Sequence, residues 1–393
     1  MEHTMILTGL AVGIAFGFIL QRGRFCVTNA FRSVWVARSG TWITAFLLVI
    51  AVQAIGVTAL TQLDLIHLSW GSLPWLGVIV GGLLFGVSIV LAGGCATGTW
   101  FRSGEGLVGS WIALIFYAIG AAAMKHGSLS GVNASVRSFT VPVTTIPALG
   151  VSAWVPTVVL ALVVGVLVRH QLRKPARKVA TLPPEKTGLA HWLFEAPWHP
   201  FLTATLISVM AIITYPLSEA TGRHAGLGIT TPTGNLLEWT VTGDTSYIDW
   251  GVLLVIGILV GSFIAAAASG EFRVRVPDST QVVKSVVGGL GMGVGASWAG
   301  GCTIGNAMVE TAQFSFQGWI SFLFMFLGVG LGTKVFVLDA THRAPAAAEL
   351  GAALLLGRTP AIPGVDPARQ PARPGGGPQN LGRQHRRQGE GQE

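Results

Sequence analysis

The chain has 393 residues, of which 51% are hydrophobic and only 11% are charged, and its mean hydropathy is +0.62. Because a soluble domain carries about 25% charged residues, this composition indicates an integral membrane protein. Its three cysteines exclude a disulfide framework. The net charge of +8 comes largely from basic runs that flank apolar spans, which argues against a nucleic-acid partner.

Nine apolar runs are long enough, or nearly long enough, to cross a bilayer, which takes roughly 17–25 residues. The first is followed by Arg22 and Arg24 and lacks a small-residue cleavage site, so it is expected to stay as a helix. Two runs, Phe201–Tyr215 and Val286–Ala299, are short for a full crossing. In chain order the nine runs are Met5–Leu20, Trp42–Leu60, Trp75–Ala92, Leu107–Met124, Val151–Val168, Phe201–Tyr215, Gly251–Ala268, Val286–Ala299 and Trp319–Val337.

Lysine and arginine gather after the first, fifth and seventh spans. The loops Thr61–Pro74 and Pro216–Asp249 instead carry acids and a single basic residue, Arg223. Because basic loops stay in the cytoplasm, this bias predicts that the N-terminus lies outside and the C-terminus inside.

Composition also predicts four segments. Residues 1–170 are expected to form a first transmembrane repeat and residues 201–338 a second. Residues 171–200 are expected to be a cytoplasmic linker, because Gln171–Thr187 is polar, basic and proline-bearing. Residues 339–393 are rich in Pro, Gly, Arg and Gln, which predicts a disordered cytoplasmic tail.

Two stretches 207 residues apart are nearly the same: GGLLFGVSIVLAGGCATG at Gly81–Gly98 and GGLGMGVGASWAGGCTIG at Gly288–Gly305. The repeat places Cys95 and Cys302 at equivalent positions, and the predicted topology makes the two copies inverted. The second span has no obvious counterpart in the second half. Internal repeats of this kind are typical of transporters, whose substrate site lies where the repeats meet.

Each copy of the motif combines a glycine pair with a cysteine. Glycine clusters tend to break a membrane helix, and broken backbone is tolerated only where it is buried or lines a cavity. A new helix start would offer N–H groups and a positive dipole end to an anion. The alternative is tight helix packing with cysteine as a small core residue. Retention of the cysteine in both copies favours function. The candidate site residues are Cys95, Cys302, Gly93, Gly94, Gly300, Gly301, Thr97, Thr303, Asn306 and the third cysteine, Cys26.

Several flanking residues have two readings. Arg22 and Arg24, beside Cys26, are most simply a cytoplasmic anchor. Arg102 and Glu105 are three residues apart and are expected to pair with each other. If Asn306–Gln317 is helical, its polar residues share one face, which either lines a vestibule or is an ordinary wet surface.

The motifs GRFC, GGCATGxxxRxGEG and GGCTxGN followed by FSxQGW resemble those of the YeeE/YedE family of bacterial inner-membrane proteins. The resemblance covers Met5–Thr333. It implies thiosulfate import along a central path of three cysteines, matched here to Cys26, Cys95 and Cys302. It also implies short helices entering from both sides and a cytoplasmic sulfur-carrier partner of the TusA type. Transfer between thiols would use S–H···S contacts without a covalent intermediate.

The expected fold is therefore an all-α polytopic membrane protein with about nine transmembrane helices, short re-entrant helices and two pseudo-symmetric repeats. The expected function is thiosulfate import, with the bilayer and a small sulfur anion as partners, and the chain is not expected to be an enzyme. Transport of another sulfur or selenium species stays open, as does a membrane sulfurtransferase. The latter would need a base near its thiol, and no acid or histidine lies within six residues of Cys26 or Cys302. No Walker motif, methionine cluster or histidine ligand spacing predicts a cofactor or a metal.

Overall fold

The computed structural model describes residues 2–68, 71–174 and 186–338, and the described part of the chain is almost entirely helical. Nine helices within it are long and apolar enough to cross a membrane, which confirms the predicted all-α polytopic class. The predicted tail, residues 339–393, lies outside the described residues. The elements in chain order are α1 (Glu2–Gly23), α2 (Val27–Val36), α3 (Thr41–Gln62), β1 (Leu73–Pro74), α4 (Trp75–Leu91), α5 (Ala96–Gly104), α6 (Val108–Lys125), α7 (Ser130–Arg137), β2 (Thr140–Val141), η1 (Pro147–Leu149), α8 (Trp154–Leu172), α9 (Gly188–Phe194), α10 (Pro200–Glu219), α11 (Thr230–Thr242), η2 (Thr245–Tyr247), α12 (Trp250–Ala268), α13 (Ser279–Ala299), η3 (Gly305–Glu310), α14 (Phe316–Thr333) and η4 (Lys334–Leu338).

Both runs that looked short in the sequence are full helices. The apolar stretch at 201–215 extends to residue 219 in α10, and the stretch at 286–299 begins at residue 279 in α13. The first passes through Pro216, and the second starts with the polar residues Ser279–Gln281. A hydropathy reading therefore underestimates both helices because their ends are polar or carry proline.

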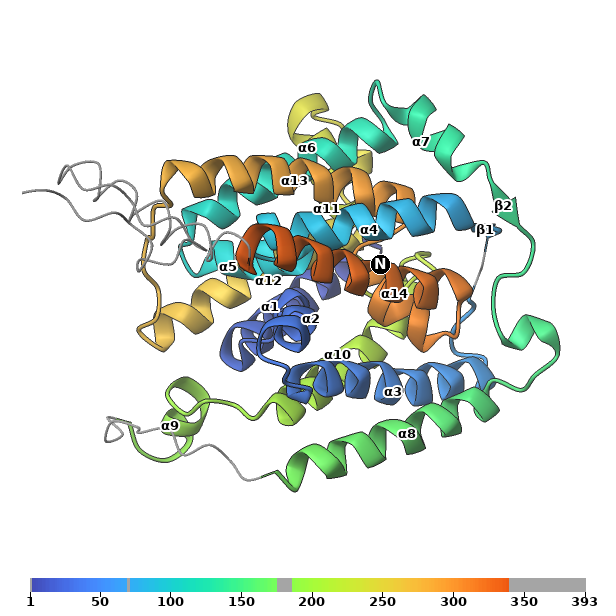
Figure 1. Cartoon of the computed structure of the whole chain (residues 1–393), viewed down its shortest axis with the longest axis horizontal. Coiled ribbons are helices and arrows are strands. Elements are labelled where there is room, and N and C mark those ends of the chain that lie inside the picture. Colours follow the sequence, from blue (N-terminus) through green and yellow to red (C-terminus); the bar gives the residue numbers. More distant parts are fainter. Residues whose placement is uncertain (1, 69–70, 175–185, 339–393) are drawn as a thin grey trace, which may run out of the picture. The chain divides into compact units, whose positions relative to one another are not determined.

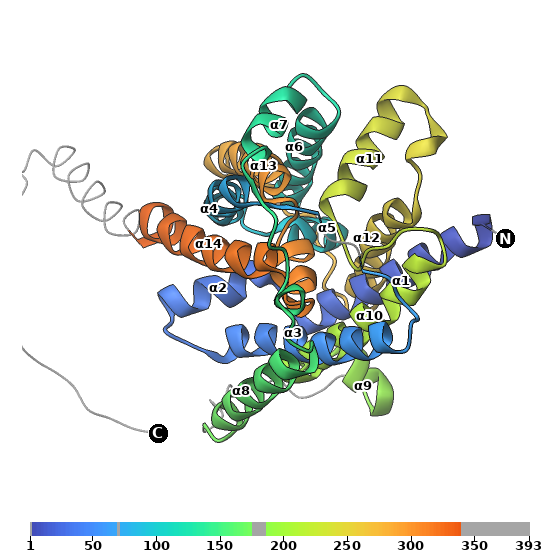
Figure 2. The ribbon, with the colours of Figure 1, turned by 90° about the vertical axis from the view of Figure 1, so that its right-hand side faces the viewer.

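Eight long helices pack as two groups of four, one of α1, α3, α10 and α12 and the other of α4, α6, α13 and α14. Short helices lie between the groups, and each touches one helix of either group (Figures 1 and 2). Helices α5 and α11 contact α12 and α6, whereas α2 and η3 contact α3 and α14. The short helices therefore occupy the interior, which is where the cysteines lie.

The principal packed pairs keep their pattern when the two halves of the chain are exchanged. The exchange replaces α1–α3 by α10–α12 and replaces α4, α5 and α6 by α13, η3 and α14. Thus α1 against α12 corresponds to α10 against α3, and α6 against α13 corresponds to α14 against α4. The second span, α3, therefore has a packing counterpart, α12, which the sequence did not reveal. The helix left over is α8, which packs along α3 at the edge of its group (Figure 1).

The loops gather at two ends of the helices. At one end, which we call the arginine face, Arg24 pairs with Glu271 and the backbone of Arg273 bonds that of Glu105. At the opposite face β1 pairs with β2 and the backbone of Ile146 bonds Phe314. Successive spans alternate between these ends, and the aligned segments of α4 and α13 run antiparallel, with Gly81 beside Gly295 and Gly288 beside Ala92.

Glycines allow the long helices to touch along their backbones. A Cβ on Gly13 of α1 would lie 2.8 Å from the Cα of Gly257 of α12 and would overlap the carbonyl of Leu254. Gly120 and Gly293 make the same kind of contact between α6 and α13. Because lipid tails compete equally well for apolar side chains, such close backbone contact is a main source of helix association in a bilayer.

The first prediction concerns this contact. Gly13→Val and Gly257→Val each add a side chain where the partner's backbone lies, so each is expected to destabilise the fold by about 1–3 kcal/mol. Gly165→Val on α8 is the matched control, because a Cβ there meets nothing within 4 Å. Melting temperatures of the purified proteins in detergent measure the effect. Equal melting temperatures for all three variants and the wild type would contradict it.

Candidate functional site

Each of the three cysteines follows a residue with left-handed backbone by two positions. These residues are Arg24 (φ 47°), Gly93 (φ 74°) and Gly300 (φ 85°), before Cys26, Cys95 and Cys302 respectively. A left-handed residue ends a helix and turns the chain, and glycine adopts this conformation without strain. The glycine pairs of the repeat are thus explained by geometry. Cys26 escaped the repeat analysis because an arginine makes its turn.

Two of the cysteines begin short helices. Cys26 is the extended residue before α2, and Cys95 holds the same place before α5, where its Sγ accepts a hydrogen bond from the Gly98 N–H at 3.4 Å. The two thiols interact directly with each other. A Cβ built on Gly98 would lie 3.5 Å from one sulfur and 3.6 Å from the other. The N-terminal ends of α2 and α5 therefore meet at a pair of thiols.

The third thiol continues this row. Thr303, next to Cys302, places its hydroxyl beside the thiol of Cys95. The Tyr117 hydroxyl interacts electrostatically with both Cys95 and Cys302 and donates to Thr230 Oγ1 at 2.9 Å. Because Tyr117 lies near the middle of α6, the row lies near the middle of the surrounding spans. All three thiols are free and buried.

Cys302 also lines a cavity of about 150 Å³ on the side of the opposite face. Its other walls are the loop before α11, the first residues of α11 and the side chains of Asn306 and Glu310. Arg223 lines it too, held by the carbonyl of Gly226 at 3.2 Å and stacked over Trp250 at 5.8 Å. Since a water molecule occupies about 30 Å³ of liquid, the cavity has room for a small hydrated anion.

Polar side chains satisfy the broken backbone around the thiols. Arg102 of α5 donates to the carbonyl of Gly93. Asn306 donates to the carbonyls of Ala299 at 2.8 Å and Gly301 at 3.3 Å. A Cβ on Gly301 would lie 3.0 Å from Asn306 Oδ1, so this loop needs its second glycine for close approach. The expected Arg102–Glu105 pair is replaced by the bond from Arg102 to the loop.

The predicted polar stripe over Asn306–Gln317 does not form one helix face. A π-helix spans 305–310, Phe314 turns with φ 58°, and α14 starts at residue 316. The side chains still meet in part, because Gln317 Nε2 donates to Asn306 Oδ1 at 3.0 Å. The stripe is therefore the inner lining of a folded-back loop rather than a wet helix surface.

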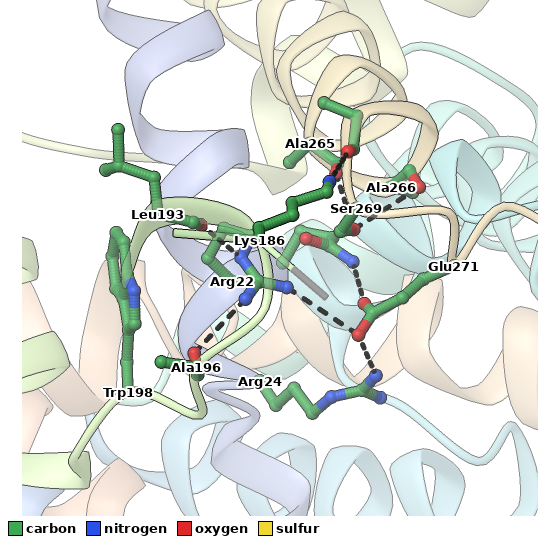
Figure 3. Close-up of polar contacts among 12 residues, drawn as sticks. Arg22, Arg24, Lys186, Leu193, Ala196, Trp198, Ala265, Ala266, Ser269 and Glu271 are labelled. Atoms are coloured by element: carbon green, nitrogen blue, oxygen red, sulfur yellow. Dashed lines mark hydrogen bonds and ion pairs between the residues drawn. The ribbon is translucent and has the colours of Figure 1, made fainter. Parts of the chain in front are cut away.

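At the arginine face, Glu271 lies between two arginines of the segment that carries Cys26 (Figure 3). It pairs with Arg24 at 2.9 Å and with Arg22 at 3.6 Å, and it accepts from Gln21 Nε2 at 2.7 Å. Arg22 also donates to the carbonyls of Leu193 and Ala196 after the linker. The interpretation of Arg22 as a surface anchor is wrong, because its side chain is only 3% exposed.

An acidic residue follows the short segment after each motif. Burial raises the pKa of the Glu105 carboxyl, although Arg24 and Arg102 lie nearby, and burial also raises that of Glu310. Each carboxyl is therefore protonated at a higher pH than an exposed glutamate. Glu310 lines the cavity beside Cys302, so its charge acts on whatever enters there.

The structure brings most of the predicted residues together. Cys26, Cys95 and Thr303 are in contact, Cys302 is adjacent, Gly93 and Gly300 make the turns, and Asn306 and Gly301 support the loop. Gly94 has no close contact that requires glycine. Sequence reasoning missed Thr28, Tyr117 and Arg223. The only local signal for Thr28 is the Cys-x-Thr spacing that it shares with Thr97.

Comparison with known proteins agrees with this geometry. Residues 22–331 match the family described as "Sulphur transport", and this range contains all three cysteines. The chain belongs to this sulphur-transport family. The resemblance inferred from the motifs is thereby confirmed.

Two relatives cover most of the chain. The thiosulfate transporter TsuA of Escherichia coli is 52% identical over 327 residues, covering 83% of this chain and 93% of the relative. TsuA of Spirochaeta thermophila is 33% identical over 339 residues, covering 82% and 97%. A probable transporter, YedE of Salmonella typhimurium, is 37% identical over 122 residues, or 30% of this chain and 29% of that protein. These relatives are transporters rather than enzymes.

The second prediction concerns the Cys302 loop. Asn306→Ala removes donors from two buried carbonyls, and each group left unpaired costs about 1–3 kcal/mol. We expect a lower melting temperature and faster alkylation of Cys302 by a maleimide in a background with Cys26→Ala and Cys95→Ala. Asn133→Ala on α7 is the matched control, because its side-chain oxygen has no partner in the structure. If Asn306→Ala behaves like this control, the loop is held by other contacts.

Proposed function

We propose that the protein transports thiosulfate along the row Cys302, Cys95 and Cys26. The observation that carries the proposal is the meeting of three buried thiols at chain turns, two of which start short helices. The names of the two full-length relatives support thiosulfate as the substrate.

The chemistry of the row suits this substrate. Thiosulfate is a dianion with a soft terminal sulfur and three hard oxygens, and bare burial of such charge is very costly. The positive ends of α2 and α5 meet at the thiols, and the first residues of α11 line the cavity beside Cys302. Thiols are weak, polarizable donors, so each holds the sulfur loosely enough to release it. Conduction needs several sites of this weak kind.

The order of steps follows from the contacts. The anion enters the cavity beside Arg223, meets Cys302, passes Thr303 to Cys95 and then reaches Cys26. Arg102 acts electrostatically on Cys26 and supplies positive charge on the inner part of the path. The exit lies near Arg24 and Glu271. No covalent bond to sulfur forms in any step.

The direction of transport depends on the orientation of the chain. Arg22, Arg24, Arg273 and Arg275 lie together at the arginine face, and clustered basic residues favour the cytoplasmic side. Orientation by this rule places the N-terminus outside, makes transport an import and fits a bacterial inner membrane. A TusA-like carrier would then receive thiosulfate at the arginine face.

The same proposal includes the division into repeats. The corresponding helix pairs support two inverted halves, α1–α6 and α10–α14, with 1–170 and 201–338 as their bounds and 171–200 as the connection. The connection contains α9, whose Phe194 ring lies 6.0 Å from that of Phe18. A tail at 339–393 stays a prediction.

The third prediction tests the thiols. In vesicles that contain only this protein, Cys95→Ala and Cys302→Ala are expected to abolish or strongly reduce uptake of labelled thiosulfate, and Cys26→Ala to impair it. Removal of a small buried thiol costs little stability when the site can collapse, so the variants are expected to fold. Melting temperature is the control. Wild-type uptake by the triple alanine variant would return these residues to core packing, and a persulfide found by mass spectrometry would favour a sulfurtransferase.

The fourth prediction tests orientation in a background without native thiols. Thr245→Cys lies exposed at the opposite face and Thr280→Cys lies exposed at the arginine face. A maleimide that cannot cross membranes is expected to label Thr245→Cys in intact cells and Thr280→Cys only after lysis. The reverse pattern would overturn import as the direction.

A further inference from the structure

Three buried threonine hydroxyls near the thiols have no hydrogen-bond partner in the protein. They are the Oγ1 atoms of Thr28, Thr97 and Thr303, and their side chains belong to residues that are 4%, 2% and 0% exposed. Buried polar groups are nearly always paired, and a buried group left unpaired costs about 1–3 kcal/mol. Three orphans around one site therefore need an explanation.

Their positions in the chain follow one pattern. Thr28 and Thr97 are each two residues after a thiol, and Thr303 directly follows the third. Thr28 lies beside the thiol of Cys26, and Thr303 lies beside that of Cys95. Hydroxyls and thiols are thus interleaved along the row on which the proposed function rests.

Local structure explains why these hydroxyls stay unpaired. Other buried threonines nearby bond a helix carbonyl four residues earlier, as Thr233 does to Ile229 at 2.6 Å and Thr311 to Ala307 at 2.8 Å. Thr28 and Thr97 are the second residues of α2 and α5, so no helical carbonyl lies four residues before them. Thr303 lies in the loop between α13 and η3. Each hydroxyl is left to donate to something that is not part of the chain.

We propose that Thr28, Thr97 and Thr303 donate hydrogen bonds to the oxygens of the passing anion, while the neighbouring thiols hold its sulfur. This inference rests on the proposed function and deepens it, because it adds specificity residues to the thiol row. The ligand class is a small sulfur oxyanion with one soft end and one oxygen-rich end. A row of thiols alone would not recognise the oxygen-rich end. Paired thiols and hydroxyls match both ends at each step.

One orphan hydroxyl elsewhere supplies a matched control. Thr333 Oγ1 is also buried without a partner, but it lies at the end of α14, far along the chain from any cysteine and outside the row. Loss of its hydroxyl therefore tests the effect of removing an unpaired polar group alone. The thiol-adjacent residues differ from it in position and not in chemistry.

The experiment compares Val, which is isosteric but lacks the hydroxyl, with Ser, which keeps it. Thr28→Val, Thr97→Val and Thr303→Val are each expected to raise the concentration of thiosulfate at half-maximal uptake by about tenfold, the loss of one hydrogen bond to a charged group. The Ser variants are expected to retain uptake within about twofold of wild type, because one hydroxyl donor is kept. Because no partner in the protein is lost, melting temperatures of the Val variants are expected to equal or exceed that of wild type. Thr333→Val is expected to match them in stability and wild type in uptake.

The outcomes separate the two proposals. Unchanged half-maximal concentrations in all three Val variants overturn the hydroxyl proposal while the thiol row stands on its own variants. A lower melting temperature in the Val variants, or equal loss in Val and Ser, also overturns it, because the threonines are then structural. Absence of thiosulfate uptake by the wild type instead overturns the proposed function itself, and the hydroxyl proposal with it.

Discussion

Broken backbone in the middle of a membrane span is the constraint on which this structure depends. The first and last turns of a helix leave N–H and carbonyl groups unpaired, and no water or lipid group in the hydrocarbon region replaces their partners. The protein meets this demand differently at the two kinds of end. Carbonyls at the broken C-termini accept from Arg102 after α4 and from Asn306 and Arg137 after α13. The N–H groups at the new helix starts keep their positive potential and face the thiols.

This arrangement works only because the short helices are shielded from lipid. Two groups of four long helices enclose them, and glycine pairs such as Gly13 with Gly257 and Gly120 with Gly293 bring the long helices close enough to do so. The interior can then be polar without being wet. A buried thiol row, orphan hydroxyls and two half-buried arginines are affordable in such a place when a passing anion pairs with them in turn.

Charge is arranged along the same line. Arg223 lies by the cavity at the opposite face, Arg102 lies beside the inner thiols, and Arg24 lies at the arginine face against Glu271. An anion would therefore meet a cation near each stage of its passage without meeting one that is fully unpaired. Weak retention at each stage follows, and weak retention is what transport requires of a binding site.

The sequence by itself determined the membrane class, the nine spans, the family and the importance of Cys95 and Cys302. These follow from composition, hydropathy and a repeat, which are local properties of the chain. It also predicted helix breaks at the glycine pairs, since glycine has a physical preference for the left-handed turns found at Gly93 and Gly300. Only the tertiary structure decided that Cys26 joins the row, because an arginine makes its turn and no repeat marks it. Only the tertiary structure matched α3 to α12, buried Arg22, broke the polar stripe after η3 and left Thr28 unpaired beside a thiol. Each of these depends on which distant segment occupies the neighbouring space, and long-range packing is not written in any local pattern of residues.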